Sequence, residues 1–218
     1  PIIFLCGFKS DMRGSKAEWL ADYCRRQDRS FLRFDYFAHG QSDGDFKHYT
    51  IGKGISDTVF MMEHFMDRSA IIIGSSMGGW IGLKLLQLQP ETIHGFIGIA
   101  AAPDFTRKIY ASLHDGHLKQ LDEQGFFEED SGYDEPYIFT RTLFDDGENH
   151  CLLGRPLEFD GPVHLLQGKQ DASVDWRMPE AINACFDGSA TITLIEDGDH
   201  SLSRPQDLEK LKAAIEEM

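Results

Sequence analysis

The chain has 218 residues, a formal net charge of −15 and an isoelectric point near 4.9. This length suits a single domain, residues 1–218, that buries about 70% of the surface of its unfolded chain. Such an acidic composition argues against nucleic acids and anionic membranes as partners, because binding to phosphates requires basic side chains.

Strand and helix patterns alternate through most of the sequence. Strands are expected at residues 2–6, 31–34, 70–73, 96–100, from 163 onward and at 191–195, and helices at 16–26, 54–66, 79–88 and 207–218. The strands are short runs of apolar residues, whereas the helices repeat apolar residues every three or four positions. This alternation predicts a mostly parallel sheet with helices on both faces.

The strand at 70–73 runs into Gly74-Ser75-Ser76-Met77-Gly78, and a helix pattern begins at once. A G-x-S-x-G pattern between a strand and a helix is typical of a nucleophile elbow, a sharp turn that exposes a serine. Ser76 rather than the adjacent Ser75 is the candidate nucleophile, because of these two serines only Ser76 has glycine two residues away on both sides. The same pattern occurs by chance in glycine-rich loops, so the hypothesis needs an acid and a base elsewhere in the chain.

Two later strands each end in a loop that carries one of these groups. Asp171 follows the strand that begins at Val163, and His200 follows the strand at 191–195. The chain order serine, acid, histidine is the one that accompanies this elbow, and open α/β sheets bind ligands at the carboxyl ends of their strands. The sequence therefore predicts a triad in which His200 takes the proton of Ser76 and Asp171 orients the imidazole.

The alternation stops between Asp104 and about Phe159, where acidic residues accumulate. We expect this segment to be an insertion that forms a small cap over the sheet, with the acidic residues on its solvated face. Most of its apolar residues are expected to form the core of the cap. Tyr137 and Phe139 in this segment, together with Trp80 after the elbow, are expected to line the substrate pocket.

Several stretches together resemble the α/β-hydrolase family, and the resemblance covers nearly the whole chain. They are Arg33-Phe34-Asp35-Tyr36, Gly44 after Ser42-Asp43, Gly74 to Trp80, His150-Cys151-Leu152-Leu153 and Gly168 to Trp176. The sequence is most similar to a branch of mammalian mitochondrial enzymes that are acyl-glucuronide esterases and palmitoyl-protein thioesterases. It departs from the family at Ala38, where members usually have glycine, and the family's first two strands are expected to be absent.

The resemblance implies how the oxyanion of the reaction is bound. An elbow serine needs two backbone donors, one from the residue after the nucleophile and one from the loop after the first strand. These donors are expected to be the N–H groups of Met77 and Phe8. The family also leaves an alternative acid, Asp104, which follows the strand at 96–100. His39, His94 and His164, which lie in or beside expected loops and strands, are interpreted as structural.

These residues predict a serine hydrolase that cleaves carboxylic esters or thioesters through an acyl-enzyme. Acyl-protein thioesterase and acyl-glucuronide esterase activities are implied by the resemblance alone, with a small molecule or an acylated protein as substrate. A serine peptidase of the same fold and a non-catalytic binding or scaffold protein remain as alternatives. Neither metal-ligand spacing nor a nucleotide-binding glycine pattern occurs, so no metal and no cofactor are expected.

The four cysteines are Cys6, Cys24, Cys151 and Cys185. They are scattered without a C-x-x-C pair, which indicates free thiols in a reducing compartment. No targeting signal is visible at the start, and the apolar runs are too short to span a bilayer. The expectation is therefore a cytoplasmic protein without membrane insertion.

Overall fold

A six-stranded sheet forms the centre of the computed structural model, which describes residues 1–130 and 136–218. Its strand order is β2-β1-β3-β4-β7-β8, and all five neighbouring pairs are parallel. In chain order the strands are β1 (Ile2–Leu5), β2 (Phe31–Arg33), β3 (Ala70–Ser75), β4 (Ile93–Ile99), β7 (Val163–Gly168) and β8 (Thr191–Ile195). The prediction of a mostly parallel sheet is confirmed.

The central strands are apolar because both of their faces are covered. Every residue of β1, β3 and β7 is buried, whereas the edge strands β2 and β8 are only partly so. In β3 the run Ile71-Ile72-Ile73 pairs with Ile2-Ile3-Phe4 of β1. Continuous rather than alternating apolar runs are what strands of a parallel sheet require when helices cover both faces.

The helices outside the region between β4 and β7 are α1 (Ser15–Arg26), α2 (Ile51–Phe65), α3 (Met77–Leu88), α7 (Met178–Ala184) and α8 (Pro205–Glu216), with short 3-10 turns η1 (Phe46–His48) and η2 (Pro90–Thr92). Helix α2 begins three residues before its predicted start, because Thr50 caps it by accepting a hydrogen bond from the Lys53 N–H at 3.3 Å. Helix α7 is not predicted, since seven residues are too few to show a helical period.

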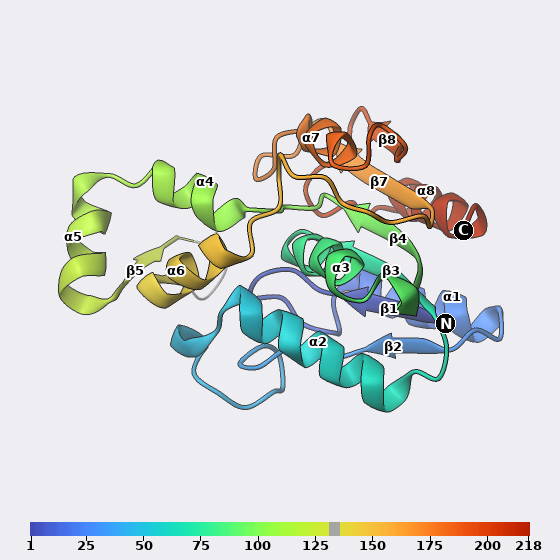
Figure 1. Cartoon of the computed structure of the whole chain (residues 1–218), viewed down its shortest axis with the longest axis horizontal. Helices are drawn as coiled ribbons and strands as arrows, with labels where there is room; N and C mark the ends of the chain where they lie inside the picture. The colour runs from blue at the N-terminus through green and yellow to red at the C-terminus, as the bar shows by residue number, and fades with distance from the viewer. Residues whose placement is uncertain (131–135) are drawn as a thin grey trace.

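Between β4 and β7 the chain forms a separate lobe, which projects to the left in Figure 1 while both termini lie at the right. The lobe consists of α4 (Phe105–Ala111), α5 (Asp115–Gln124), β5 (Phe126–Glu129), β6 (Tyr137–Thr140) and α6 (Arg141–Asn149). It lies within the predicted insertion at 104–159, of which residues 131–135 are outside the described part. Its antiparallel strand pair, with Phe127 opposite Phe139, is not foreseen in the sequence.

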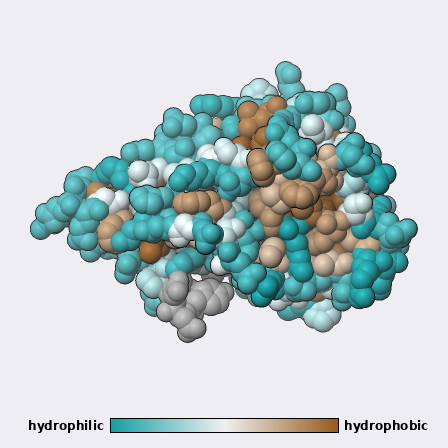
Figure 2. All heavy atoms as spheres, turned by 90° about the horizontal axis from the view of Figure 1, so that it is seen from below, coloured by the Kyte–Doolittle hydropathy of each residue, from teal (hydrophilic) through white to brown (hydrophobic). Residues whose placement is uncertain are grey.

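Helix α2 also carries an exposed apolar surface. Figure 2 shows apolar residues gathered on the side of the molecule where α2 runs in Figure 1. On this helix Phe60 and Phe65 are 55% and 64% exposed, and the ring of His64 stacks on that of Phe60 with a centroid distance of 3.9 Å. His64 is thus a histidine at the surface of the molecule.

Candidate active site

The predicted nucleophile lies in a strained turn. Ser76 stands between the last residue of β3 and the first residue of α3, with φ 54° and ψ −118°. A non-glycine residue keeps such a backbone only where its surroundings impose it. A Cβ atom added to Gly74 would lie 2.3 Å from the Gly78 carbonyl oxygen, and one added to Gly78 would lie 2.1 Å from that of Leu5. Both motif glycines are therefore required by the close approach of backbone segments.

The structure brings the three predicted triad residues together. The Ser76 hydroxyl oxygen lies 3.2 Å from Nε2 of His200, and Nδ1 of His200 lies 2.8 Å from Oδ2 of Asp171. Asp171 reaches this position from the loop after β7, and His200 from the loop after β8. The carboxyl ends of three parallel strands thus place side chains that are 95 and 29 residues apart in the sequence in one hydrogen-bonded row.

Hydrogen-bond donors surround the carboxylate of Asp171. Its side chain is fully buried, and Oδ1 accepts the N–H groups of Ser173 and Val174 at 2.8 Å each. Oδ2 accepts the side-chain amide of Gln167 at 2.8 Å in addition to His200. Burial opposes ionisation, but the hydrogen bonds from His200 and from the backbone outweigh it, so the pKa of Asp171 lies below its ordinary value. The carboxylate is therefore ionised and fixed in orientation.

Sequence reasoning does not identify Gln167 as part of this arrangement. The residue is fully buried near the carboxyl end of β7. A polar side chain within the apolar run of a central strand is the signal that could have found it, because a buried amide needs a partner.

Asp104, the alternative acid, has different partners. Its Oδ1 and Oδ2 accept the backbone N–H groups of Leu152 and Leu153 at 2.9 and 3.0 Å. The residue is 6% exposed and adopts a left-handed conformation with φ 57° at the start of α4. Asp104 therefore connects the beginning of the lobe to the segment that leads back to the sheet. Both of its carboxylate oxygens accept hydrogen bonds from that segment.

The loop that carries the predicted oxyanion donor lies next to Ser76. A Cβ atom added to Gly7 would lie 3.4 Å from the Ser76 Cβ atom and 3.9 Å from its hydroxyl oxygen. The Gly7 carbonyl accepts the N–H of Ser10 at 3.1 Å, which closes a tight turn with Phe8 and Lys9 at its centre. Among the described residues the Phe8 N–H donates no backbone hydrogen bond. Met77 is the first residue of α3, where helix N–H groups have no intrahelical acceptor.

The side chain of Phe8 is the centre of a group of aromatic rings, which we call the Phe8 cluster. Its members lie 5.0 to 6.3 Å from the Phe8 ring centroid and are Phe46, Tyr49, Phe105, Tyr137 and Phe139. The ring of Phe139 stacks on that of Phe8, with an interplanar angle of 10°. Two of the predicted pocket residues, Tyr137 and Phe139, thus lie beside the loop that adjoins Ser76.

Trp80, the third predicted pocket residue, lies deeper. It is fully buried, and its ring meets the edge of Phe105 at a centroid distance of 5.5 Å. Its indole N–H donates to the His150 carbonyl at 3.1 Å. Asp104 accepts the N–H groups of Leu152 and Leu153 shortly after His150, so Trp80 and Asp104 both hold the stretch that follows α6. Whether Trp80 also contacts substrate stays a prediction.

Comparison with known proteins gives the family. Residues 1–133 match the model of the alpha/beta hydrolase fold. The whole chain aligns with the mouse protein named "Palmitoyl-protein thioesterase ABHD10, mitochondrial", with 31% identity over 224 residues and 74% of that protein covered. The chain belongs to the α/β hydrolase family. Solved structures of relatives agree over 99% of this hydrolase.

Two of these structures come from distant organisms. A protein from Agrobacterium vitis S4 assigned as a hydrolase is 37% identical with a TM-score of 0.94, and 86% of its chain is covered. The α/β hydrolase domain-containing protein 10 from mouse is 30% identical with a TM-score of 0.90, and 88% of its chain is covered. The resemblance expected from the sequence is therefore confirmed.

The predicted cytoplasmic location is wrong. It is overturned by the curated relatives from mouse and rat, both of which are named mitochondrial. The prediction depended in part on four scattered cysteines, which are all free and buried in the structure. Free thiols report on the redox state around a protein rather than on its compartment, so they do not distinguish two reducing compartments.

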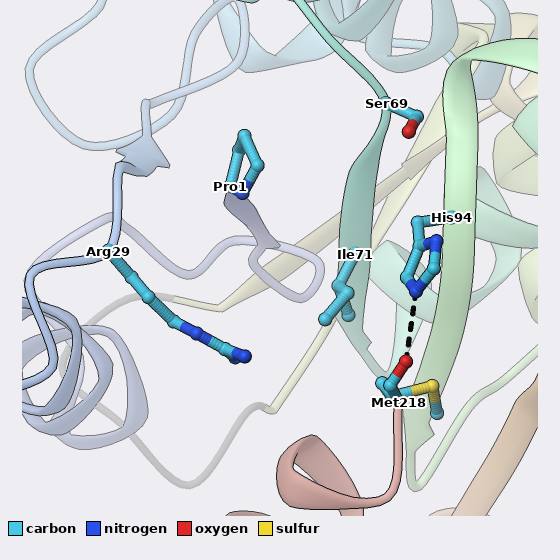
Figure 3. Close-up of a pocket in the computed structure, with 6 residues that line it drawn as sticks. All are labelled: Pro1, Arg29, Ser69, Ile71, His94 and Met218. Carbon is cyan, nitrogen blue, oxygen red and sulfur yellow. Dashed lines mark hydrogen bonds between the residues drawn. The ribbon is translucent and has the colours of Figure 1, made fainter.

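Two cavities of this hydrolase lie away from Ser76. The first, of about 210 Å³, is lined by Pro1, Arg29, Ser69, Ile71, His94 and Met218 (Figure 3). Most of these residues stand at or just before the amino ends of strands. This cavity therefore lies at the amino ends of the strands, whereas the triad lies at their carboxyl ends. The second, of about 270 Å³, lies on the lobe beside β5. Neither cavity includes a residue of the predicted triad.

Two further observations concern the described residues alone. Within residues 1–130 and 136–218, no group of three histidine, cysteine or acidic side chains is arranged to hold a metal ion. In the same part of the chain, no helix combines the length and the apolar character needed to cross a membrane.

Proposed function

We propose that this hydrolase cleaves thioesters and carboxylic esters through an acyl-enzyme formed on Ser76. The observation that carries the proposal is the row of hydrogen bonds from the Ser76 hydroxyl through His200 to Asp171, with distances of 3.2 and 2.8 Å. A serine hydroxyl is a weak nucleophile at neutral pH and requires a base within hydrogen-bonding distance. The name of the mouse relative, a thioesterase, supports the same reaction class.

In the first half of the reaction, the Ser76 oxygen attacks the acyl carbon while Nε2 of His200 takes the hydroxyl proton. Asp171 stabilises the positively charged imidazolium that results. The tetrahedral intermediate collapses, the bond to the leaving sulfur or oxygen breaks, and that atom leaves as a thiol or alcohol with the proton from His200. A water molecule then repeats the sequence on the acyl-enzyme and releases the carboxylic acid together with free Ser76.

Backbone amides stabilise the charge that develops on the acyl oxygen. We assign this task to the N–H groups of Met77 and Phe8. The turn at Gly7 approaches the Ser76 side chain, which supports the assignment of Phe8. Loss of one such donor typically slows an acyl-transfer enzyme by about 100- to 1000-fold.

We infer the substrate class from the surface around the loop Gly7 to Ser10, which we call the oxyanion loop. The Phe8 cluster places aromatic rings beside the loop that adjoins Ser76, and Tyr137 and Phe8 are partly exposed. Apolar rings of this kind are suited to an acyl chain rather than to a charged group. We therefore propose an S-acylated protein or a small acyl ester as substrate, with the acyl group against the partly exposed rings of Tyr137 and Phe8. Phe139 is 3% exposed and stacks on Phe8, so it supports this surface from inside.

Labelling with a fluorophosphonate tests the nucleophile. Ser76→Ala should abolish labelling and hydrolysis, whereas Ser75→Ala is a matched control, because it removes the neighbouring hydroxyl at the end of β3 and should keep both. Absence of labelling in the folded wild type, or equal labelling of Ser76→Ala, would exclude this mechanism.

A chain-length series tests the substrate class. The value of kcat/KM for acyl thioesters should stay constant or rise from short to long acyl chains, since each added CH₂ group gains apolar contact. A steady fall beyond short chains would contradict the assignment of a long-chain acyl substrate while leaving the hydrolase mechanism intact.

A further inference from the structure

We propose that His39 is a positioning residue that holds the oxyanion loop, Gly7 to Ser10, in its active conformation by accepting the backbone N–H of Lys9. This inference rests on the proposed function, because it assigns the Phe8 N–H to the oxyanion. His39 follows β2 in the sequence and belongs to none of the triad contacts.

The hydrogen bonds of the His39 ring define its protonation. The residue is 2% exposed, and its Nδ1 lies 3.0 Å from the Phe37 carbonyl oxygen. Because a carbonyl oxygen only accepts, the ring proton is on Nδ1. Nε2 then carries a lone pair, and the Lys9 N–H donates to it at 3.2 Å. A neutral imidazole of this tautomer thus bridges the loop after β2 and the loop after β1.

The loop that His39 contacts needs such a support. Lys9 has φ 55°, a left-handed backbone that a lysine adopts at a cost. The Gly7 carbonyl accepts the Ser10 N–H at 3.1 Å, so Phe8 and Lys9 occupy the two central positions of a tight turn. A turn with positive φ at its third residue usually contains glycine there. With lysine instead, a bond from outside the turn is required to keep the peptide plane between residues 8 and 9 in place.

The position of that peptide plane bears on the reaction. Phe8 and Lys9 share one peptide group, and the Phe8 N–H precedes it by two rotatable bonds. If the Lys9 N–H turns away from His39, the dihedral angles of Phe8 change and its N–H turns away from the acyl oxygen. Oxyanion donors act only when they are fixed in advance in the correct direction.

The aromatic side chains around His39 keep its ring in this place. The rings of Tyr36, Phe46 and Tyr49 lie 5.5, 5.1 and 4.4 Å from the imidazole, between ring centroids. Phe46 and Tyr49 also contact the ring of Phe8, at 5.0 and 6.3 Å. The imidazole and the Phe8 side chain are therefore packed against the same wall. His39 thus holds the backbone of the oxyanion loop, while Phe46 and Tyr49, which pack on His39, also hold the side chain of Phe8.

Three substitutions separate positioning from packing. His39→Gln keeps an acceptor at the place of Nε2, His39→Asn keeps a polar group only at the place of Nδ1, and His39→Leu removes both. The control His64→Leu makes the same exchange at the surface of α2. Each purified full-length variant is assayed for kcat and KM on one thioester, for binding of an alkyl boronic acid, which forms a tetrahedral adduct on the serine, and for thermal unfolding.

Loss of one oxyanion donor sets an upper limit of about 1000-fold on the effect. A displaced donor should cost less, about 10- to 100-fold in kcat for His39→Leu and His39→Asn, with KM changed less than threefold. The affinity for the boronic acid should fall by the same factor, and His39→Gln should restore most of the loss. If His39 were needed only for packing, His39→Gln and His39→Asn would both lower the unfolding temperature, and both would lose activity to the same extent.

The results distinguish the two proposals. If the wild type neither reacts with a fluorophosphonate nor hydrolyses esters, the proposed function fails. If the wild type is active and a folded His39→Leu variant keeps its kcat within twofold, the role of His39 is refuted. If His39→Leu does not fold, the comparison of the Gln and Asn variants decides, and equal kcat values for these two overturn the inference.

Discussion

Replacing Asp104 tests whether Asp104 has a structural role while Asp171 is the acid of the triad. Asp104 and Asp171 both follow a strand of the sheet, and family precedent allows either to be the triad acid. In the structure Asp171 binds His200, whereas Asp104 binds the backbone of Leu152 and Leu153. Replacing Asp104 should therefore reduce stability, and replacing Asp171 should reduce catalysis.

The structure sets the size of each effect. Asp104→Ala removes two hydrogen bonds to a carboxylate, leaves two N–H groups without an acceptor and places alanine in a left-handed conformation, so the free energy of unfolding should fall by about 3 to 4 kcal/mol. Asp104→Asn retains one acceptor oxygen and a residue that tolerates positive φ, which limits the loss to about 1 to 2 kcal/mol. Asp171→Asn should lower kcat by about 10⁴-fold, because the imidazole loses the partner that fixes its tautomer.

Urea unfolding followed by tryptophan fluorescence measures the stability of the three variants. Hydrolysis of p-nitrophenyl butyrate at 15 °C, well below the unfolding transition, measures kcat. Asp104→Asn should keep kcat within about tenfold of the wild type, since its carboxylate does not touch the reacting groups. A loss of 1000-fold or more in folded Asp104→Asn, together with an active Asp171→Asn, would show that the two roles are exchanged.

Two further predictions concern the loop after β2. Ala38 has φ 58° at a position where the family usually has glycine, so Ala38→Gly should raise the free energy of unfolding by about 1 kcal/mol, measured by urea unfolding; a loss of stability would contradict the strain argument. Burial lowers the pKa of His39 below its ordinary value of 6.5, while the Phe37 carbonyl, Asp35 and Asp57 oppose the shift. The unfolded chain then binds the proton more tightly, so the wild type should lose stability relative to His39→Gln as pH falls below 6.5 and regain it fully above that pH. Parallel pH profiles for the two proteins would refute this.

The strands of the sheet and the elbow at Ser76 are predictable because they depend on local patterns. Apolar runs that stop at glycine indicate buried parallel strands, and G-x-S-x-G needs only its two neighbouring elements to be recognised. The lobe is less predictable, since β5 and β6 have only four residues each and, within the described residues, pair only with one another. Strands of this length leave no clear period in a sequence.

Sequence patterns alone identify a candidate nucleophile, a candidate base and two candidate acids in this hydrolase. Ser76, Asp171 and His200 each follow a strand, and parallel strands bring their carboxyl ends to one edge of the sheet. The folded chain shows which of the two carboxylates meets the imidazole. It also shows that His39, which the sequence left as a structural histidine, accepts a hydrogen bond from the Lys9 N–H. These contacts depend on the direction of single hydrogen bonds between loops that are distant in sequence, and residue type and spacing do not specify such directions.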